Sequence, residues 1–488
     1  MNSLFYELIA DKQIKRFIKI LEILEKQKET ISFEEVREIV AVTMATLKND
    51  LEKIQERIPA SIIIKTTKEF ISLEATSTEI QNCIFDIAQN TLSYQMLRYS
   101  FNQPEISLEE LSEKLLSSTS TLKNRIQHMN PILERYHCRL SSYTTTMRGE
   151  EVNIRCFYRA YFSEFRDLFI SKETEQRQDY YQVFDAIRQE MLSRKCKMLN
   201  SSYFQVIQWL LITQERMEAN HHIKLDSIFV DNIKKISMYQ EYKIAYTKVI
   251  TKEELCEDDI VWSYIGELDA VVYTLEKSNL SRCRSGPILK SYQTIIDRVI
   301  KQVADQLSID QKNIVNFIKL HQCFFINLYL ISQLSATFQM VSQDLKQHVK
   351  QHLTPIYQAW YDMLDSNRGF SFLEYHQDVC CKLAMISSQF TYHKPAKVKR
   401  VLFSFTGETG LSSYLEAKAR MLFSKEVECI FAFKQPLSNE IIESINPEIV
   451  VSNYNNIENI TFDNIIRMAY IPSEYDWNRL STYILKIE

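Results

Sequence analysis

The sequence predicts a mainly α-helical protein with two N-terminal winged helix-turn-helix modules, two all-helical bundles and a small C-terminal α/β domain. Three observations lead to this prediction. Only 6 of the 488 residues are glycine, which disfavours large β-sandwiches and barrels because they need many tight turns. A segment that begins at Ile31 recurs at Ile106 with the pattern of a helix pair. After residue 398, apolar runs of strand length alternate with helical periods.

The composition excludes several kinds of site. The few glycines form neither a dinucleotide-binding nor a phosphate-binding loop motif, so we expect no cofactor. The 10 cysteines are scattered and lack metal-ligand spacing. We therefore expect neither a metal nor a disulfide framework, as is typical of a reducing compartment. No apolar window has the length of a membrane span, and the first residues lack the pattern of a signal peptide. These features predict a cytoplasmic protein that does not bind membranes.

The repeat places two similar segments at one fixed offset. Residues 31–38 read I-S-F-E-E-V-R-E, and residues 106–113 read I-S-L-E-E-L-S-E. The same offset aligns T-L-K-N at 46–49 with T-L-K-N at 121–124. Agreement over about twenty positions is hard to attribute to chance, so the two segments are expected to share one local fold.

Each copy carries the signals of three helices followed by two strands. A serine with a glutamate three residues later predicts a capped helix start, at Ser32 and at Ser107. The predicted elements are helices near 12–27 and 77–99, second helices of the repeat from Thr43 and Ser118, and strands within 61–73, at 138–142 and at 152–154. Three helices with a short turn before the last are the helix-turn-helix pattern, and the strands would form wings. Pro131 is expected to interrupt the last helix of the second copy.

The second helix of each repeat would enter the major groove of DNA. Because the net charge of the chain is −4, DNA binding would depend on a local basic face. Hydroxyl, amide and basic side chains suit contacts with bases and phosphates. The candidates are Thr43, Thr46, Lys48 and Asn49 in the first copy, Thr119, Ser120, Thr121, Lys123, Asn124 and Arg125 in the second, and Lys65, Lys68 and Arg148 in the wings. Alternatively, the hydroxyls only cap helices and the lysines are solvated surface.

The middle of the chain reads as amphipathic helices, with periods at 181–196, 203–218, 288–306, 312–335 and 338–352. The sequence Ser285-Gly286-Pro287 marks a seam that divides the region into two blocks. Histidines are the residues here that could carry reversible phosphoryl chemistry. Each one alone is more often a structural or surface residue than a phosphoryl acceptor.

The last part of the chain predicts a small parallel α/β sheet. Strands are expected at 399–405, 427–433 and 448–452, with helices at 411–423 and 439–445. The loop 406–410 between the first strand and helix could bind an anion at a helix N-terminus. It contains no cysteine or histidine, so it offers no phosphoryl nucleophile. A regulatory or dimerising domain without chemistry is therefore expected.

In this order of modules the chain resembles the Mga/AtxA-like virulence transcription regulators of Gram-positive bacteria. The resemblance is most specific at 31–51 and 106–126. It implies modules at 1–75 and 76–165, phosphotransferase-system regulation domains (PRDs) at 170–285 and 286–393, and an enzyme IIB-like domain at 398–488. It also implies a non-enzymatic, cytoplasmic regulator that binds promoter DNA, forms a homodimer partly through its last domain, and is tuned by the phosphocarrier protein of the sugar phosphotransferase system.

The resemblance assigns residues unevenly. The second module is the main DNA reader in this family, which favours Thr119, Thr121, Lys123 and Arg125. The candidate phosphorylation sites are His221 and His222 in the first block and His321, His352, His376 and His393 in the second. A phosphocarrier would place cysteine near Ser404 or Phe405, and its absence predicts no phosphotransfer there. The alternatives to a DNA regulator are a phosphotransferase-system component and a scaffold that binds only protein.

Overall fold

The computed structural model describes residues 3–26, 30–162, 174–194, 200–250, 255–274, 290–367, 369–391, 399–423, 427–433, 437–454 and 460–486. These residues are mainly α-helical, which confirms the predicted fold class at that level. They divide into two compact units. Unit 1 comprises Met1–Glu150 and Ala160–Lys172, and unit 2 comprises Glu151–Arg159 and Glu173–Glu488.

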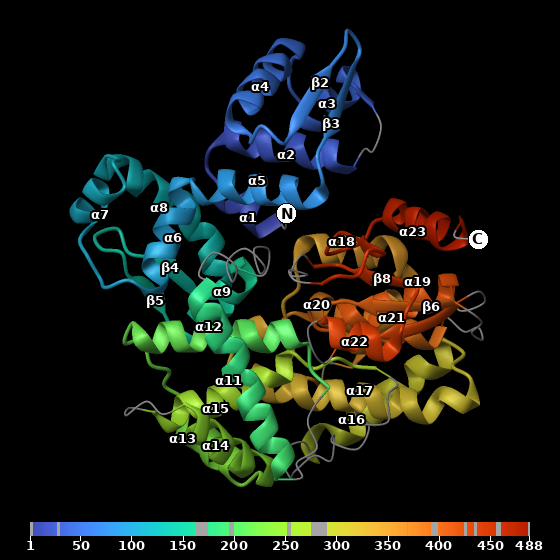
Figure 1. Cartoon of the computed structure of the whole chain (residues 1–488). Helices are drawn as coiled ribbons and strands as arrows, with labels where there is room; N and C mark the ends of the chain where they lie inside the picture. Colours follow the sequence, from blue (N-terminus) through green and yellow to red (C-terminus); the bar gives the residue numbers. More distant parts are fainter. Residues whose placement is uncertain are drawn as a thin grey trace. The chain divides into compact units, whose positions relative to one another are not determined.

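Unit 1 begins with module one, which contains the first copy of the repeat (Figure 1). Its elements are α1 (Ser3–Leu8), α2 (Lys12–Lys26), β1 (Ile31–Ser32), α3 (Phe33–Val40), α4 (Met44–Arg57), β2 (Ile63–Thr66) and β3 (Phe70–Glu74). The strands form an antiparallel sheet in the order β1-β3-β2. The fully buried Val36, Leu47 and Ile54 form the apolar stripe of the helix pair. Arg16 of α2 holds the buried Asp50 of α4 at 2.6 Å, which joins the first helix to the second helix of the pair.

Module two contains the second copy of the repeat. Its elements are α5 (Ser77–Gln89), α6 (Leu92–Asn102), α7 (Leu108–Lys114), α8 (Thr119–Leu133), η1 (Glu134–Tyr136), β4 (Cys138–Leu140) and β5 (Met147–Gly149). The single helix expected at 77–99 is in fact two helices, because Thr91 caps a new helix start. The prediction that Pro131 interrupts the last helix is wrong, because this proline lies in the last turn of α8.

The strand expected at 152–154 is also wrong. These residues lie in helix α9 (Glu151–Phe162), and β5 is the true partner of β4. The alternation of apolar and polar residues was misleading because the polar ones are buried too. Asn153 accepts a hydrogen bond from Ser335, and Arg155 is fully buried. A helix that is buried on several faces can therefore imitate the period of a strand.

Unit 2 contains most of the helices. They are α11 (Thr174–Ser193), α12 (Tyr203–Glu218), α13 (Ser227–Lys234), α14 (Ser237–Val249), α15 (Glu257–Asp269), α16 (Lys290–Gln306), α17 (Gln311–Ser332), η3 (Ala336–Gln339), α18 (Gln343–His352), α19 (Thr354–Ser366) and α20 (His376–Thr391). The helix expected at 338–352 is split, because Ser342 caps a new start at α18. The predicted seam at 285–287 lies outside the described residues.

Helix α17 is long and apolar enough to cross a membrane by length and composition. Its residues Phe317, Leu320 and Phe325 are fully buried within unit 2. A buried core helix passes the same test as a membrane span. Cys323 on this helix is disulfide-bonded, which departs from the expectation of no disulfides. The seven cysteines at 83, 138, 156, 256, 380, 381 and 429 form no disulfide.

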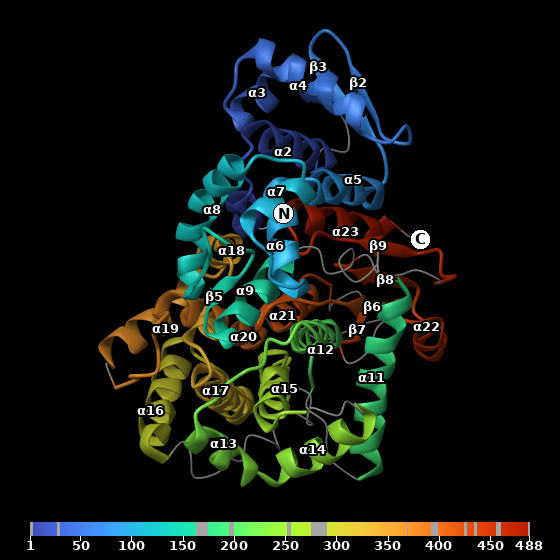
Figure 2. The same ribbon diagram turned by 90° about the vertical axis from the view of Figure 1, so that its left-hand side faces the viewer.

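The chain ends in a parallel sheet with the order β7-β6-β8-β9 (Figure 2). Its elements are β6 (Lys399–Ser404), α21 (Leu411–Phe423), β7 (Val427–Phe431), α22 (Asn439–Ile445), β8 (Ile449–Ser452), β9 (Ile465–Arg467) and α23 (Glu474–Lys486). The parallel pairing agrees with the alternation of strands and helices in the sequence. The sequence analysis did not anticipate β9 and α23. Residue Ile465 pairs with Val450, and Trp477 of α23 is fully buried.

Candidate nucleic-acid interface

The helix pair of module two is fixed by side-chain caps at both starts. The Ser107 hydroxyl accepts the Glu110 N–H at 3.1 Å, and the Glu110 carboxylate accepts the Ser107 N–H at 3.0 Å. At the next start, the Ser118 hydroxyl accepts the N–H of Thr121 at 3.1 Å. In module one, Ser32 and Thr43 make the equivalent caps of α3 and α4. The repeated sequence thus positions the N-terminus of α4 and of α8 in the same way.

Hydroxyl groups cluster at both of these helix starts. The Ser118 hydroxyl lies 2.8 Å from the hydroxyls of Ser120 and Thr121. In module one, the hydroxyls of Thr43 and Thr46 are 2.8 Å apart. The Thr43 hydroxyl therefore caps a helix, as expected in the alternative to DNA contact. Because a hydroxyl offers one donor and two acceptor positions, Thr46, Ser120 and Thr121 keep capacity for a further partner. Ser118, in contrast, uses all three positions.

The predicted contact residues of α8 divide between two surfaces. Lys123 and Asn124 are exposed, and neither makes a hydrogen bond or ion pair with another described residue. Arg125 is half-buried and lines a cavity of about 510 Å³ in unit 1, together with Arg57 and Asp86. Helical phase explains this difference, since Arg125 lies three residues after the buried Leu122 and four residues before the buried Met129. The exposed face of α8 therefore contains Lys123 and Asn124, with Arg125 at its edge.

The predicted contact residues of module one are partly occupied within the protein. The ammonium of Lys48 lies 5.9 Å from the ring centre of Phe33. Lys65 forms an ion pair with Glu74 across the hairpin. Asn49 and Lys68 are exposed. Compared with α8, this surface therefore offers fewer polar side chains for contact with DNA.

The charges of α4 and α8 differ in a way that distinguishes the modules. Helix α8 contains Lys123 and Arg125 and no acidic residue. Helix α4 contains three basic residues, Lys48, Lys53 and Arg57, and three acidic residues, Asp50, Glu52 and Glu56. DNA is a dense polyanion, so an excess of positive charge on a helix favours its approach. On this criterion α8 is better suited to DNA than α4.

The structure adds Arg139, which the sequence analysis did not select. Arg139 of β4 lies directly opposite Arg148 of β5 in the antiparallel pair. Both are exposed, whereas Leu140 and Met147 of the same strands are buried. The second strand of this wing was predicted at 152–154, which left Arg148 in a turn. The pairing of Arg139 with Arg148 was therefore not predicted. The remaining signal was the alternation of apolar and basic residues at 138–140.

His222 is a candidate histidine that is hydrogen-bonded to a buried carboxylate. Its Nδ1 lies 3.0 Å from Asp259, and its side chain is 35 % exposed. Asp259 also binds the buried Arg155 of α9 at 3.1 Å. A carboxylate on Nδ1 fixes the ring and leaves Nε2 as the nucleophilic atom. The neighbouring His221 contributes its backbone carbonyl, which accepts a hydrogen bond from Arg155 at 2.9 Å.

The other described histidines differ in solvent exposure and in their hydrogen-bond partners. His321 is fully buried, and both of its ring nitrogens have partners at 2.8 Å, namely the Phe317 carbonyl and the Ser387 hydroxyl. Burial lowers the pKa of His321 to about 4. His352 is partly exposed, with Nδ1 at 3.4 Å from Glu474. His393 lies outside the described residues.

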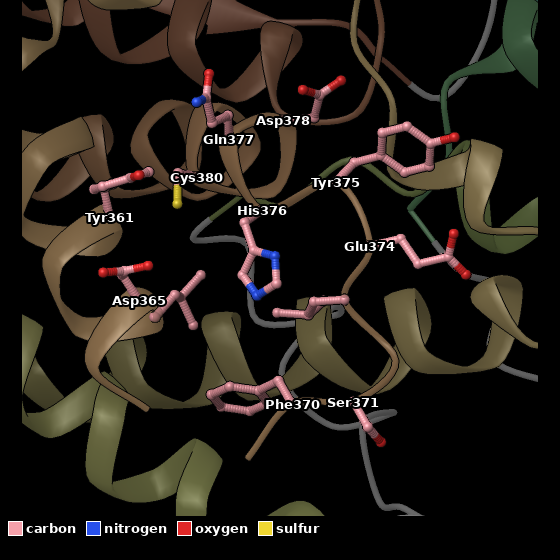
Figure 3. A pocket seen from close by; sticks show the side chains of 12 residues that line it. Tyr361, Asp365, Phe370, Ser371, Glu374, Tyr375, His376, Gln377, Asp378 and Cys380 are labelled. Atoms are coloured by element: carbon pink, nitrogen blue, oxygen red, sulfur yellow. The ribbon is translucent and has the colours of Figure 1, made fainter. Parts of the chain in front are cut away.

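His376 lies in a cavity of about 720 Å³ at the start of α20. Figure 3 shows its imidazole pointing into the space between Asp365 and Glu374. Tyr361 and Tyr375 also line this cavity. A ring in this position is open to small groups, but the carboxylates on both sides would repel a phosphoryl group.

The loop 406–410 is enclosed within unit 2. Thr406 and Thr409 are buried, and Thr409 donates to the backbone carbonyl of Asp269 at 2.7 Å. The side chain of Gln205 donates to the carbonyl of Gly407. Glu408 contacts the Ser342 N–H at 3.4 Å, and burial raises its pKa. This loop therefore joins helices of unit 2 and presents no nucleophile to solvent. Among the described residues, no group of three or more metal-ligating side chains could hold a metal ion.

Comparison with known proteins places both repeats in one class of domain. Residues 11–69 match the M protein trans-acting positive regulator (MGA) HTH domain, and residues 76–162 match the Mga helix-turn-helix domain. Two curated relatives align over nearly the whole chain. A "Putative trans-acting regulator" of Streptococcus pneumoniae serotype 4 is 20 % identical over 485 residues, which cover 91 % of this chain and 92 % of that protein. The capsule synthesis positive regulator AcpB of Bacillus anthracis is 18 % identical over 500 residues, which cover 97 % of this chain and 99 % of that protein. The two predicted helix-turn-helix domains are thereby confirmed.

Proposed function

We propose, from the premise that this chain belongs to the Mga-like family of trans-acting regulators, that it binds promoter DNA mainly through module two. Members of this family are transcription regulators and not enzymes, in agreement with the sequence analysis. The observation that carries the proposal is the face of α8, where Lys123 and Asn124 are exposed on a helix without acidic residues. The hydroxyls of Ser120 and Thr121 at its capped start add contacts to bases or phosphates, with Thr119 beside them. A cytoplasmic location follows from this role.

The repeat supplies a matched test of this assignment. Lys123 and Asn124 align with Lys48 and Asn49 of module one. We expect Lys123→Ala/Asn124→Ala in the full-length protein to weaken binding to an AT-rich promoter duplex, because both phosphate and base contacts are lost. Lys48→Ala/Asn49→Ala should have a smaller effect. Fluorescence anisotropy across a salt series measures both variants beside the wild type.

Three results would contradict the proposal in different ways. A larger loss in the module one variant would assign the reading role to α4. Equal binding by the wild type and both variants would place the contacts elsewhere. No binding by the wild type at low salt would favour the protein-binding scaffold.

We also propose that the two helical blocks are PRD-like and that His222 is the first acceptor for the phosphocarrier protein. The Nδ1 contact with Asp259 orients the imidazole, and the pair of Asp259 with Arg155 offsets the carboxylate charge. Transfer from phosphoenolpyruvate through enzyme I and the phosphocarrier should label the wild type and not His222→Ala. His376→Ala is the matched variant and should keep the label. Label that persists in His222→Ala and disappears in His376→Ala would exchange the two assignments.

The C-terminal sheet is proposed to be an enzyme IIB-like domain that contributes to a homodimer. Exposed apolar side chains support this, since Met421 and Leu422 end α21 and Tyr475 and Tyr483 lie on α23. Trp477 of α23 contacts Phe423 of α21, so these exposed side chains lie on neighbouring helices, and a contiguous apolar patch there would mark an interaction surface. Leu422→Glu/Tyr483→Glu should convert a dimer into a monomer in light scattering of the full chain. A monomeric wild type, or a variant that stays dimeric, would refute this surface.

A further inference from the structure

The outward face of the β4–β5 hairpin carries two arginines, Arg139 and Arg148. Arg139 and Arg148 are paired residues of the antiparallel ladder, so their Cβ atoms are about 5 Å apart. Cys138, Leu140 and Met147 of the same strands are buried. Neither guanidinium has a hydrogen bond or ion pair among the described residues, and both side chains are exposed. The two positive groups therefore share one free surface.

This arrangement costs stability, because like charges directly opposite each other on neighbouring strands repel. Three other arginines of unit 1 are paired with carboxylates. Arg16 pairs with Asp50, Arg37 with Glu34, and Arg135 with Glu7. In the hairpin of module one a carboxylate neutralises the exposed cation, since Lys65 pairs with Glu74. An unpaired cationic pair in this setting points to a ligand that supplies the missing negative charge.

The hairpin that carries the pair is held firmly against α8. The side chain of Asn130 in α8 bonds to both backbone groups of Leu140, at 2.7 Å to its N–H and 3.1 Å to its carbonyl. Gly149 has a φ of +145°, and a Cβ there would lie 2.8 Å from the carbonyl oxygen of His137. Arg148 thus precedes a position where only glycine fits. A fixed backbone keeps the Cβ atoms of Arg139 and Arg148 close, so both guanidinium groups can reach one ligand.

We propose that Arg139 and Arg148 together form a clamp for a backbone phosphate of duplex DNA, next to the site read by α8. Two planar guanidinium groups match the oxygens of a phosphodiester, which they can bind through paired N–H donors. The anchor at Asn130 places the hairpin beside the helix that carries Lys123, so one duplex can reach both. The inference rests on the proposed function of module two. It extends the DNA interface from α8 to two residues of the β4–β5 hairpin.

The test compares salt dependence and stability in the full-length protein. Arg139→Gln, Arg148→Gln and the double variant are titrated with the promoter duplex and with an unrelated duplex, beside Lys301→Gln, an exposed lysine of α16 in unit 2. The double variant should lower the slope of log affinity against log salt by about 1, because the clamp neutralises one phosphate, and each single variant should lower it by part of that amount. The loss should be the same on both duplexes, because a phosphate carries no sequence information. Lys301→Gln should leave the slope unchanged.

Thermal unfolding separates loss of the clamp from loss of the fold. Arg139→Gln should melt at the wild-type temperature or above it, since the repulsion is relieved. Arg139→Glu should melt higher still and bind DNA more weakly than Arg139→Gln, because a glutamate opposite Arg148 occupies it. Wild-type slopes in both glutamine variants would overturn the clamp while the proposed function stands. A wild type that binds no duplex would overturn both.

Discussion

Arg155 and Asp259 form an ion pair of 3.1 Å in which both side chains are completely buried. Arg155 also binds Glu151 at 3.0 Å, and Glu151 in turn binds Arg216. The pair ties the start of α9, the helix that follows module two, to α15 of the first helical block. His222 is the partly exposed member of this network, so a change of its charge would act directly on a buried ion pair.

Asp259→Asn should therefore destabilise unit 2 by about 3 kcal/mol, because the buried Arg155 loses one of its two carboxylate partners and keeps only Glu151. Chemical denaturation of the full chain, followed by hydrogen exchange of α9 and α15, measures this loss. Arg155→Met/Asp259→Leu should recover much of the stability, since it removes both charges. Lys234→Ala breaks the exposed Lys234–Asp231 pair and serves as the control, with an expected change below about 0.5 kcal/mol. An equal effect of Asp259→Asn and Lys234→Ala would contradict the argument.

Leu116→Gly should stabilise module two by about 1 kcal/mol. Leu116 lies in the turn between α7 and α8 with a φ of +47°, a left-handed conformation that is unfavourable for a branched side chain. Its side chain is 95 % exposed, so the substitution removes no core contact. Leu116→Ala is the matched control, because it removes the exposed side chain and keeps the strained backbone. The thermal midpoint should rise for glycine alone, and an equal rise for alanine would assign the effect to the apolar side chain.

Local signals explain what could be predicted from the sequence. The capping boxes at Ser32 and Ser107 depend on residues three positions apart, and both are present in the structure. The bounds of α21 and α22 were likewise predicted from short apolar periods between turn residues. Contacts between distant positions had no such signal. The pairing of Ile465 with Val450 depends on the completed sheet, so β9 was missed.

In the candidate interface, too, local features were predicted and features that depend on packing were missed. The repeat placed Lys123 and Asn124 at the start of a helix, and the structure leaves them exposed. The partly buried position of Arg125 depends on how α8 packs, and Arg139 became visible only with the register of β4 and β5. His222 and Asp259 are far apart in the chain, so their contact could not be anticipated from spacing.

Acidification from pH 6.5 to pH 4 should destabilise unit 2 through His321. Burial lowers the pKa of this histidine from 6.5 to about 4. The unfolded chain therefore binds more protons than the folded one in this range, and stability falls as the pH falls. The loss at pH 4 amounts to roughly 3 kcal/mol for a fully buried group, at about 1.4 kcal/mol per pKa unit. Melting curves of the wild type and His321→Gln at pH 7, 6 and 5 test this, and the variant should show the flatter profile. Parallel profiles would refute it.

A cysteine at position 404, the last residue of β6, should not create phosphotransfer. Ser404 is 1 % exposed, and its hydroxyl lies 2.5 Å from that of Tyr454. Thr409 and Ser413 beyond it donate to the backbone carbonyls of Asp269 and Tyr273, so other parts of unit 2 cover the loop. A phosphocarrier needs an in-line approach to the sulfur, which this covering prevents. Ser404→Cys should therefore fold and gain no acid-resistant, thiol-linked label from the phosphocarrier protein. A label on this variant would show that the loop opens in solution and would revive the phosphotransferase-system component as a function.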